Sequence, residues 1–412
     1  MTYWKWLLQR LRQKLWWQAV LYGILGVITA FLATLTEEYF PWEFSLAIST
    51  EEVSGLLGII SSSMLAVTTF SLGAMTSAFG GASSNVTPRA TKLLMEDRLT
   101  HNVLSTFIGT FVFSIVGIVV LSTGSYGEQG RAVLFIITVF VIALIVVQLL
   151  RWVNHLISLG RVGATIERVE QAALSAMIER QEKPYLGANP WWDATPPEGA
   201  QPLKAEAVGY IQFVDISLLS EIAEREELQL YLPVNSGTLV YPDTPLLWVC
   251  GDLSEELIAE LHDQFVLEPS RNFEQDPRFG LAVMAEIGSR ALSPATNDAG
   301  TALDVIGRLT RLMVQWSKGR EEADVEYPRL YLRPLSDADM FEDAFMIMTR
   351  DGAHLVEIQL RLHKSLAALQ RIGSKRFRAA AAEQARLALA RAEASEMFPE
   401  DLKRIKEVMQ TC

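Results

Sequence analysis

Hydroxyl side chains recur along one apolar segment in the first quarter of the chain. Ser62, Thr69 and Thr76 are spaced seven residues apart within residues 53–79, a stretch that holds no Asp, Glu, Lys or Arg. Seven residues make about two helical turns, so a helix here places the three hydroxyls along one face. Such hydroxyls can replace part of a solute's hydration shell, or they can join packed helices and bond back to their own backbone. The candidate path-lining residues are Ser54, Ser61, Ser62, Thr69 and Thr76.

Two polar loops offer a second kind of chemistry. Pro88 and Arg89 follow the hydroxyl-rich segment, and a guanidinium there suits a lipid phosphate or a carboxylate. The loop over residues 290–303 is rich in residues that favour the start of a helix. Its candidate functional residues are Arg290, Ser293, Asn297, Asp298 and Thr301. Helix capping explains this loop, and the N–H groups at a helix start could also hold an anion.

The familiar signatures of enzymes and metal sites are absent from the sequence. It contains no GxGxxG, Walker A, GxSxG, CxxC or HExxH motif, and its five histidines are scattered. Four acids gather where a helix is expected to begin: Asp337, Asp339, Glu342 and Asp343. Complementing the helix dipole is the simpler explanation for them, and a metal site is the alternative. We therefore expect no catalytic residues, no metal and no cofactor.

Four stretches without any Asp, Glu, Lys or Arg are long enough to position the hydroxyls inside a membrane. They cover residues 19–36, 53–79, 103–123 and 132–150, each at least 18 residues long. About 20 residues of helix cross a bilayer, and buried helices of soluble proteins seldom run so long without a charge. We predict a four-helix transmembrane domain over residues 19–153, with its last span covering 132–153, preceded by an amphipathic inner-surface segment at residues 1–18. A signal peptide is the alternative for residues 1–36, but no small-residue cleavage site follows the apolar run.

Charge separates the two halves of the chain and orients the spans. Residues 1–160 carry a net charge of +1, and the remainder brings the total to −12. Basic residues stand at the N-terminus, around Arg89 and after the last span, whereas the loop after the first span holds five Glu and no base. The positive-inside rule then places both termini on the cytoplasmic side of the membrane. The acidic second half argues against nucleic acid as a partner.

The second half is expected to be a cytoplasmic α+β region. A connecting helix and a linker rich in Pro and Gly cover residues 154–204, and a small β-rich module follows at 205–252. Residues 253–412 read as mostly helical, with a short strand near 330–332. The predicted fold class is therefore an α-helical membrane domain followed by a cytoplasmic α+β domain.

Several short runs resemble the DUF2254 family of predicted bacterial membrane proteins. They are Ser83 to Arg89, Asp97 to Thr100, Leu104 to Ser114, Gly209 to Asp215, Gln275 to Gly280 and Arg290 to Asp298. The resemblance covers most of the chain and supports the membrane architecture, but the family name carries no activity. Members usually have Pro after the Asn-Asp pair, where this sequence has Ala299. The helix start there is therefore expected to be less rigid.

Two classes of function remain for such a chain. The first is a homo-oligomeric channel or transport-like protein of the lipid bilayer, with the second span lining the path, a regulatory cytoplasmic domain and a solute that the sequence does not name. The second is a membrane-anchored sensor or scaffold whose cytoplasmic domain binds a ligand or partner. An enzyme is the weakest class because no nucleophile and base stand together in the sequence.

Overall fold

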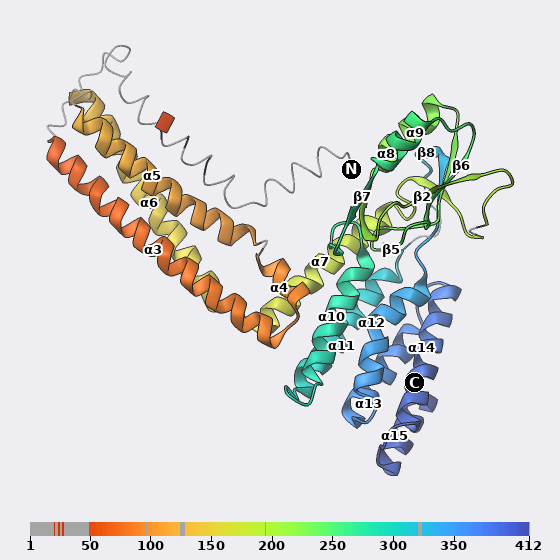
Figure 1. Ribbon diagram of the computed structural model, residues 1–412. Coiled ribbons are helices and arrows are strands. Elements are labelled where there is room, and N and C mark those ends of the chain that lie inside the picture. The colour runs from red at the N-terminus through yellow and green to blue at the C-terminus, as the bar shows by residue number, and fades with distance from the viewer. Residues whose placement is uncertain are drawn as a thin grey trace. The chain divides into compact units, whose positions relative to one another are not determined.

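The computed structural model describes residues 49–95, 97–123, 128–193, 195–319 and 324–411 (Figure 1). It also describes four separate helical positions, Val20, Ile24, Val27 and Ile28. The predicted surface segment at residues 1–18 lies outside the described residues, and so does the first span apart from those four positions. The described chain forms two compact units. The N-terminal unit holds the residues up to Ser84 and Thr91–Ala164, and the C-terminal unit holds Asn85–Ala90 and everything from Thr165 onward.

The N-terminal unit is built from long apolar helices. They are α3 (Thr50–Asn85), α5 (Arg98–Ser122) and α6 (Glu128–Ser158), with the short α4 (Pro88–Met95) between the first two. Three segments are long and apolar enough to cross a membrane: Thr50–Ser83, Leu99–Ser122 and Gly130–Ser158. The second and fourth predicted spans each fall inside one of them, and the third, 103–123, matches Leu99–Ser122 except for its last residue. The described residues thus confirm a helical membrane region with three candidate spans.

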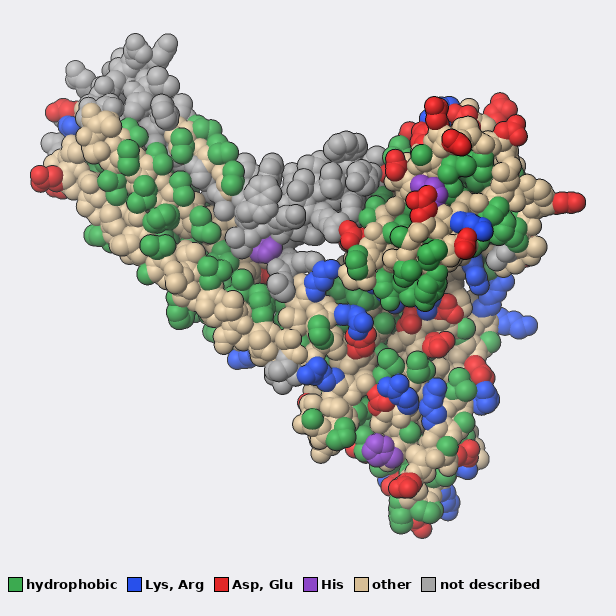
Figure 2. Space-filling view, viewed as in Figure 1, with side chains coloured by type: hydrophobic (Ala, Val, Ile, Leu, Met, Phe, Trp, Pro, Cys, Tyr) green, Lys and Arg blue, Asp and Glu red, His purple; other side chains and the backbone are tan. Residues whose placement is uncertain are grey.

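Apolar side chains hold these helices together. Leu57 of α3 packs with Phe113 of α5 and Leu134 of α6, and Met64, Phe107 and Trp152 form a second cluster. Hydrophobic side chains also cover the outer surface of the unit (Figure 2). Val139, Phe140 and Leu150 of α6 are examples with about half or more of their surface exposed. Such an outward face suits lipid and would be a liability in water.

Gly160 interrupts the connecting helix that the sequence predicts from residue 154 onward. Helix α6 stops at Ser158, and α7 begins again at Val162 and ends at Glu182. Between them Gly160 has a φ of +80°, and a Cβ at that position would lie 2.9 Å from the carbonyl oxygen of Ala78. Only glycine adopts this conformation readily and allows so close an approach. The predicted single helix is therefore two helices joined by a turn.

Two sheets form one end of the C-terminal unit (Figure 1). The five-stranded sheet has the order β1-β8-β4-β6-β2, and the three-stranded sheet has the order β5-β3-β7. The strands are β1 (Ala188–Pro190), β2 (Gln201–Lys204), β3 (Gly209–Val214), β4 (Gln229–Leu232), β5 (Leu239–Val240), β6 (Pro245–Cys250), β7 (Phe265–Glu268) and β8 (Tyr327–Leu332). Helices α8 (Ile216–Arg225) and α9 (Glu255–His262) accompany them.

Strand β8 joins the sheet from far along the chain. It pairs in parallel with both β1 and β4, with Leu330 opposite Leu230 and Leu332 opposite Leu232. All four leucines are buried in one core. The segment read as a linker also contributes β1 and β2, the two edge strands. Short edge strands with Pro are hard to recognise from local pattern, because their pairing is set by distant partners.

Six further helices belong to the C-terminal unit, which also holds α7 from Thr165 onward. They are α10 (Pro277–Ala291), α11 (Ala299–Trp316), α12 (Asp337–Asp351), α13 (Val356–Leu369), α14 (Lys375–Glu393) and α15 (Pro399–Thr411). Their starts follow capping chemistry, with Asp276, Asp298, Ser336 and Ser374 each accepting a hydrogen bond from the first turn. Leu281, Val305, Phe345 and Leu362 are fully buried among these helices. The predicted mostly helical region, residues 253–412, thus contains these six helices and α9, together with the short strands β7 and β8.

Candidate functional site

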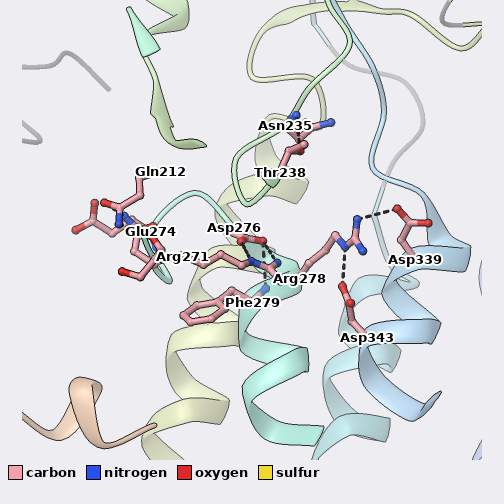
Figure 3. A network of polar contacts seen from close by, with 12 residues as sticks. Gln212, Asn235, Thr238, Arg271, Glu274, Asp276, Arg278, Phe279, Asp339 and Asp343 are labelled. Carbon is pink, nitrogen blue, oxygen red and sulfur yellow. Dashed lines mark hydrogen bonds and ion pairs between the residues drawn. The ribbon is translucent and has the colours of Figure 1, made fainter. Parts of the chain in front are cut away.

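A buried carboxylate, Asp276, stands at the start of α10 (Figure 3). Its side chain is 2% exposed. The Arg271 guanidinium donates hydrogen bonds to both of its oxygens, with Nε 2.7 Å from Oδ2 and Nη2 2.9 Å from Oδ1. The backbone N–H of Phe279 donates to Oδ1 as well. Burial raises the pKa of Asp276, and the positive charge of Arg271 opposes that rise. Arg271 and Asp276 therefore form a fixed, largely buried ion pair at the start of α10.

Gly237 makes room for this carboxylate. It has a φ of +89°, and a Cβ there would lie 2.0 Å from Oδ2 of Asp276. Nearby, Gln275 Oε1 accepts from the backbone N–H of Val214 and from the Ser236 hydroxyl. These contacts tie strand β3 to the start of α10. The motif residues around Asp276 thus fix the sheets onto the helices, which is a structural role.

Two acids in the first turns of α12, Asp339 and Asp343, pair with Arg278 of α10. Arg278 Nη1 lies 2.7 Å from Asp339 Oδ2, and its Nε lies 2.6 Å from Asp343 Oδ2. Asp337 accepts a hydrogen bond from the indole Nε1 of Trp316 at 2.9 Å. Within the residues that the structure describes, no group of three or more His, Cys, Asp or Glu is arranged to hold a metal. The two carboxylates at 339 and 343 serve to join α12 to α10.

A cavity of about 680 Å³ opens in the C-terminal unit. Its walls come from the end of α7, the end of α11, the loop after β8 and the first turns of α12 and α14. The lining residues that carry polar or aromatic chemistry are Arg180, Gln181, Tyr185, Trp192, Trp316, Arg333, Ser336, Asp337, Ser374, Arg376, Phe377 and Glu383. This volume lies within the range of small-molecule sites. No local sequence pattern predicts the cavity, because its walls come from segments up to about 200 residues apart.

Arg180 is the most unusual residue in the cavity wall. It is 5% exposed, and its Nη2 donates to Oδ1 of Asn235 at 2.5 Å. Its Nε is buried and has no hydrogen-bond partner. Burial lowers the pKa of Arg180 to about 10. Arg180 also borders a smaller cavity of about 90 Å³. It sits in α7, in a stretch where the sequence indicates an ordinary surface charge.

Arg89 lies in a segment that groups with the C-terminal unit. Its Nη1 is 2.6 Å from Oε1 of Glu286 in α10, and 59% of its side chain is exposed. Pro88 precedes it as the first residue of α4, and the hydroxyl of Thr87 accepts from the N–H of Ala90. The structure therefore places Arg89 beside a carboxylate, one of the two partners that the sequence suggested.

Side chains of the loop between α10 and α11 form hydrogen bonds that cap the two helices it joins. Asp298 accepts from the N–H and the hydroxyl of Thr301, at 3.0 and 2.6 Å, and these bonds lower the pKa of Asp298. Ser293 donates to the carbonyl of Arg290, and Asn297 takes a φ of +47°. The loop is largely exposed. Its side chains thus terminate one helix and start the next, as capping predicted.

The five path-lining candidates do not share one environment on α3. Ser61 is buried, Ser54 is partly buried, and Ser62, Thr69 and Thr76 are exposed. Each of the exposed hydroxyls donates to a backbone carbonyl of its own helix, at Ile59, Leu65 and Gly73. The described residues therefore bring Ser62, Thr69 and Thr76 together on an outward face and leave Ser61 in the interior.

A buried histidine and carboxylate meet in the N-terminal unit. His155 Nε2 lies 2.8 Å from Asp97 Oδ2, with side chains 8% and 14% exposed. The Thr100 hydroxyl donates to the same oxygen at 2.6 Å and lies 3.1 Å from His155 Nε2. Asp97 also caps α5 through the N–H of Thr100. Sequence reasoning treated His155 as isolated, because 58 residues separate it from Asp97.

Comparison with known proteins places the chain in a family. The family described as "Predicted membrane protein (DUF2254)" matches residues 12–368. The chain belongs to the DUF2254 family. The uncharacterized proteins Mb1321c of Mycobacterium bovis and Rv1290c of Mycobacterium tuberculosis are each 25% identical to it over 273 residues. The aligned part covers 63% of this chain and 51% of each relative, so the chain spans about half the length of the curated relatives it matches. No solved structure matches the chain.

Most of the sites above lie inside the DUF2254 match. Arg89, Asp276 and the loop between α10 and α11 all fall within residues 12–368. The cavity is different, because Ser374, Arg376 and Phe377 in its wall come after the matched region. The description of the family as a membrane protein agrees with the three apolar helices.

Proposed function

We propose that this DUF2254 protein is a multi-pass protein of the bacterial inner membrane that assembles as a homo-oligomeric channel or transport-like protein. Helix α3 lines its path, and the C-terminal unit regulates it from the cytoplasm. The proposal assigns no enzymatic step to the chain. What supports it most is the outward face of α3.

A line of small and hydroxyl-bearing residues runs along that face, beside the exposed apolar side chains of Ile59, Leu65, Phe70 and Leu72. Ser62, Ala66, Thr69, Gly73, Thr76 and Gly80 are all exposed, and they follow one another at spacings of three or four residues. A Cβ added at Gly73 or Gly80 would meet nothing within 4 Å. Residues at this spacing share one side of a helix, and the stretch from 62 to 76 extends about 21 Å along it. By contrast, the outward face of α6 carries Val139, Val146 and Leu150. Lipid suits α6 better than α3.

A second candidate, a membrane-anchored sensor or scaffold, also has support. Three pairs on α3, Ser62 with Ala66, Thr69 with Gly73 and Thr76 with Gly80, have the small-xxx-small spacing at which membrane helices pack closely. The three hydroxyls already bond to their own backbone. Under this alternative α3 packs against another membrane helix, and the spans only anchor and assemble the protein.

Single cysteines on α3 distinguish the two candidates. The background is a chain with Cys250→Ser and Cys412→Ser, and Ser62→Cys, Thr69→Cys and Thr76→Cys are tested one at a time. Val139→Cys, Val146→Cys and Leu150→Cys on the exposed side of α6 are the matched controls. For a channel we expect the α3 cysteines to react with small water-soluble thiol reagents in intact membranes, while the α6 cysteines stay unreactive.

An ion-flux assay in liposomes completes this test. A channel gives flux that the reagent blocks at residues 62, 69 or 76 and leaves unchanged in the α6 controls. Disulfide-linked dimers through Thr69→Cys, without thiol reactivity and without flux, would instead establish packing between copies. That result replaces the channel by the anchored sensor.

A further inference from the structure

The cavity of the C-terminal unit has a buried guanidinium in its wall whose hydrogen-bonding capacity is largely unused. A guanidinium carries five N–H donors, and burying a charged group without partners is costly. Arg180 makes one hydrogen bond, to the neutral amide of Asn235, and its Nε has no partner. Asp276 is the nearby acid, but Arg271 and the N–H of Phe279 already occupy both of its oxygens. Among the described residues, Arg180 has no carboxylate in hydrogen-bond contact.

Two helices begin in the same wall. Ser336 caps α12 and Ser374 caps α14, and both line the cavity. Helix starts carry a partial positive charge, which normally favours acidic residues in the first turn. Helix α14 instead begins with Lys375 and Arg376 and has no acid in its first turn. The protein therefore gathers positive charge at the start of α14, where a helix alone would disfavour it, whereas the first turn of α12 already holds Asp337 and Asp339.

The acids that line the cavity already have partners. Asp337 accepts from the indole of Trp316 at 2.9 Å, and Glu383 lies 2.6 Å from Arg386 on the same helix. Arg180, Arg333 and Arg376 line the cavity against these two acids. The three arginines outnumber the two acids, so the cavity lining carries a net positive charge and an anion is the complementary ligand.

Aromatic rings define the other part of the wall. The Arg376 guanidinium lies over the Trp192 ring, 3.8 Å from its centroid, and Tyr185 meets Trp192 edge-on at 6.1 Å. Nearly half of Trp192 is exposed, at 47%. A guanidinium stacked on an indole offers a flat, cationic surface on which an aromatic base can stack.

We propose that this cavity binds a nucleotide, with Arg180 and the start of α14 receiving its phosphate and the Trp192–Arg376 pair receiving its base. A volume of about 680 Å³ accommodates a ligand of that size. The site is independent of the path along α3. A nucleotide bound here gives the C-terminal unit an input, whether the membrane helices conduct a solute or only anchor the protein.

Calorimetric titration of the full-length chain in lipid nanodiscs tests the site. The probes are the four monophosphates AMP, GMP, CMP and UMP, with their four nucleosides and inorganic phosphate as the partial ligands. We expect at least one monophosphate to bind more tightly than inorganic phosphate and more tightly than its own nucleoside. If inorganic phosphate binds as tightly as the monophosphate, the base does not contribute to binding. If the nucleoside binds as tightly as the monophosphate, the cationic side chains do not contribute. Either result overturns the assignment.

Variants locate the binding within the cavity. Losing a hydrogen bond to a charged group costs about ten- to a hundredfold in affinity, so Arg180→Gln is expected to weaken the nucleotide by that factor. Because Arg180 is buried, Arg376→Gln on the exposed surface provides a second variant that leaves the core untouched. Arg378→Gln, which removes an exposed arginine of the same helix outside the cavity wall, is the matched control and should bind as the unmodified chain does.

Two results contradict the proposal. One is the absence of heat from all four monophosphates at about 1 mM, a concentration at which a ligand of even modest affinity is detected. The other is binding that Arg376→Gln and Arg180→Gln leave unchanged. The cysteine and flux experiments on α3 do not depend on either outcome, so a failure of the nucleotide site and a failure of the channel are distinguishable.

Discussion

Arg89 and Glu286 form an ion pair across 197 residues of sequence, with Nη1 2.6 Å from Oε1. The arginine side chain is 59% exposed and the glutamate 25%. Pairs that face solvent contribute at most about 1 kcal/mol to stability, so this contact matters more for where the segment lies than for how firmly the protein folds. It joins the segment Asn85–Ala90 to helix α10.

We therefore predict that Arg89→Ala disturbs assembly or transport more than Arg98→Ala does, while changing the melting temperature little. Exchanging the charges, with Arg89→Glu and Glu286→Arg in one chain, should restore what either single change removes. Size-exclusion profiles in detergent and flux in liposomes measure both effects. If Arg89→Ala and Arg98→Ala are equally harmless, Arg89 is only a charge that orients the membrane helices.

Gly237→Ala is expected to destabilise the C-terminal unit by about 2–3 kcal/mol, because the new methyl group meets the Asp276 carboxylate in a left-handed backbone conformation. Gly199→Ala is the matched control, since Gly199 has a φ of +78° but open space around the added carbon. Thermal unfolding of both variants in detergent separates the steric contact from the backbone strain. Equal melting temperatures would show that the Asp276 site has room to adjust.

His363 makes stability depend on pH in a defined direction. Its side chain is buried in α13 with both ring nitrogens unpartnered, and burial lowers its pKa to about 4. The unfolded chain binds the proton at a pKa near 6.5, so the folded state loses stability as pH falls from about 6.5 to 4 and keeps it above 6.5. The full loss from this residue is about 3 kcal/mol.

His363→Leu should therefore raise the melting temperature at pH 5 by more than at pH 7.5. An apolar side chain of similar size removes the group that must shed its proton to fold. His354→Leu, at an exposed position before α13, is the control for the loss of an imidazole. A His363→Leu chain that is no more stable at pH 5 than the unmodified chain would contradict this account.

Membrane orientation gives a further expectation. The distribution of basic residues predicts that the loop with five Glu faces the outside and that the C-terminus faces the cytoplasm. Reporter fusions after Ser45 and after Cys412 should give opposite signals, with the second one cytoplasmic. A C-terminus on the outside would reverse every assignment of sides made above.

The sequence predicted most of the secondary structure but little of its assembly. Long charge-free runs and capping residues such as Asp276 and Ser374 are local signals, and the helices that they indicated are present. The break at Gly160 and the edge strand β1 depend on close approach to distant residues, Ala78 and Tyr327 respectively. Local pattern contains no information about such partners.

For the candidate sites, too, the sequence predicted local contacts but not contacts between distant residues. Capping by Asp298 was visible because donor and acceptor are three residues apart. The buried state of Arg180 and the contact between Asp97 and His155 were not, because a charged residue inside a helix reads the same whether it faces water or a cavity. The one signal for the burial of Arg180 was a single arginine among the apolar residues that recur at helical spacing in α7, and that signal is weak.

Because β8 lies between β1 and β4, the five-stranded sheet can be completed only after most of the chain has been synthesised. Until residues 327–332 leave the ribosome, β1 has no neighbour and β4 presents an open edge beside Leu230 and Leu232. About a hundred residues separate β4 from β8, which amounts to roughly 5–20 s of translation. During that interval the nascent chain exposes an unpaired strand, and such edges pair readily with other chains. Chains interrupted before residue 327 should therefore aggregate or be degraded, whereas chains interrupted after α13 can already close the sheet.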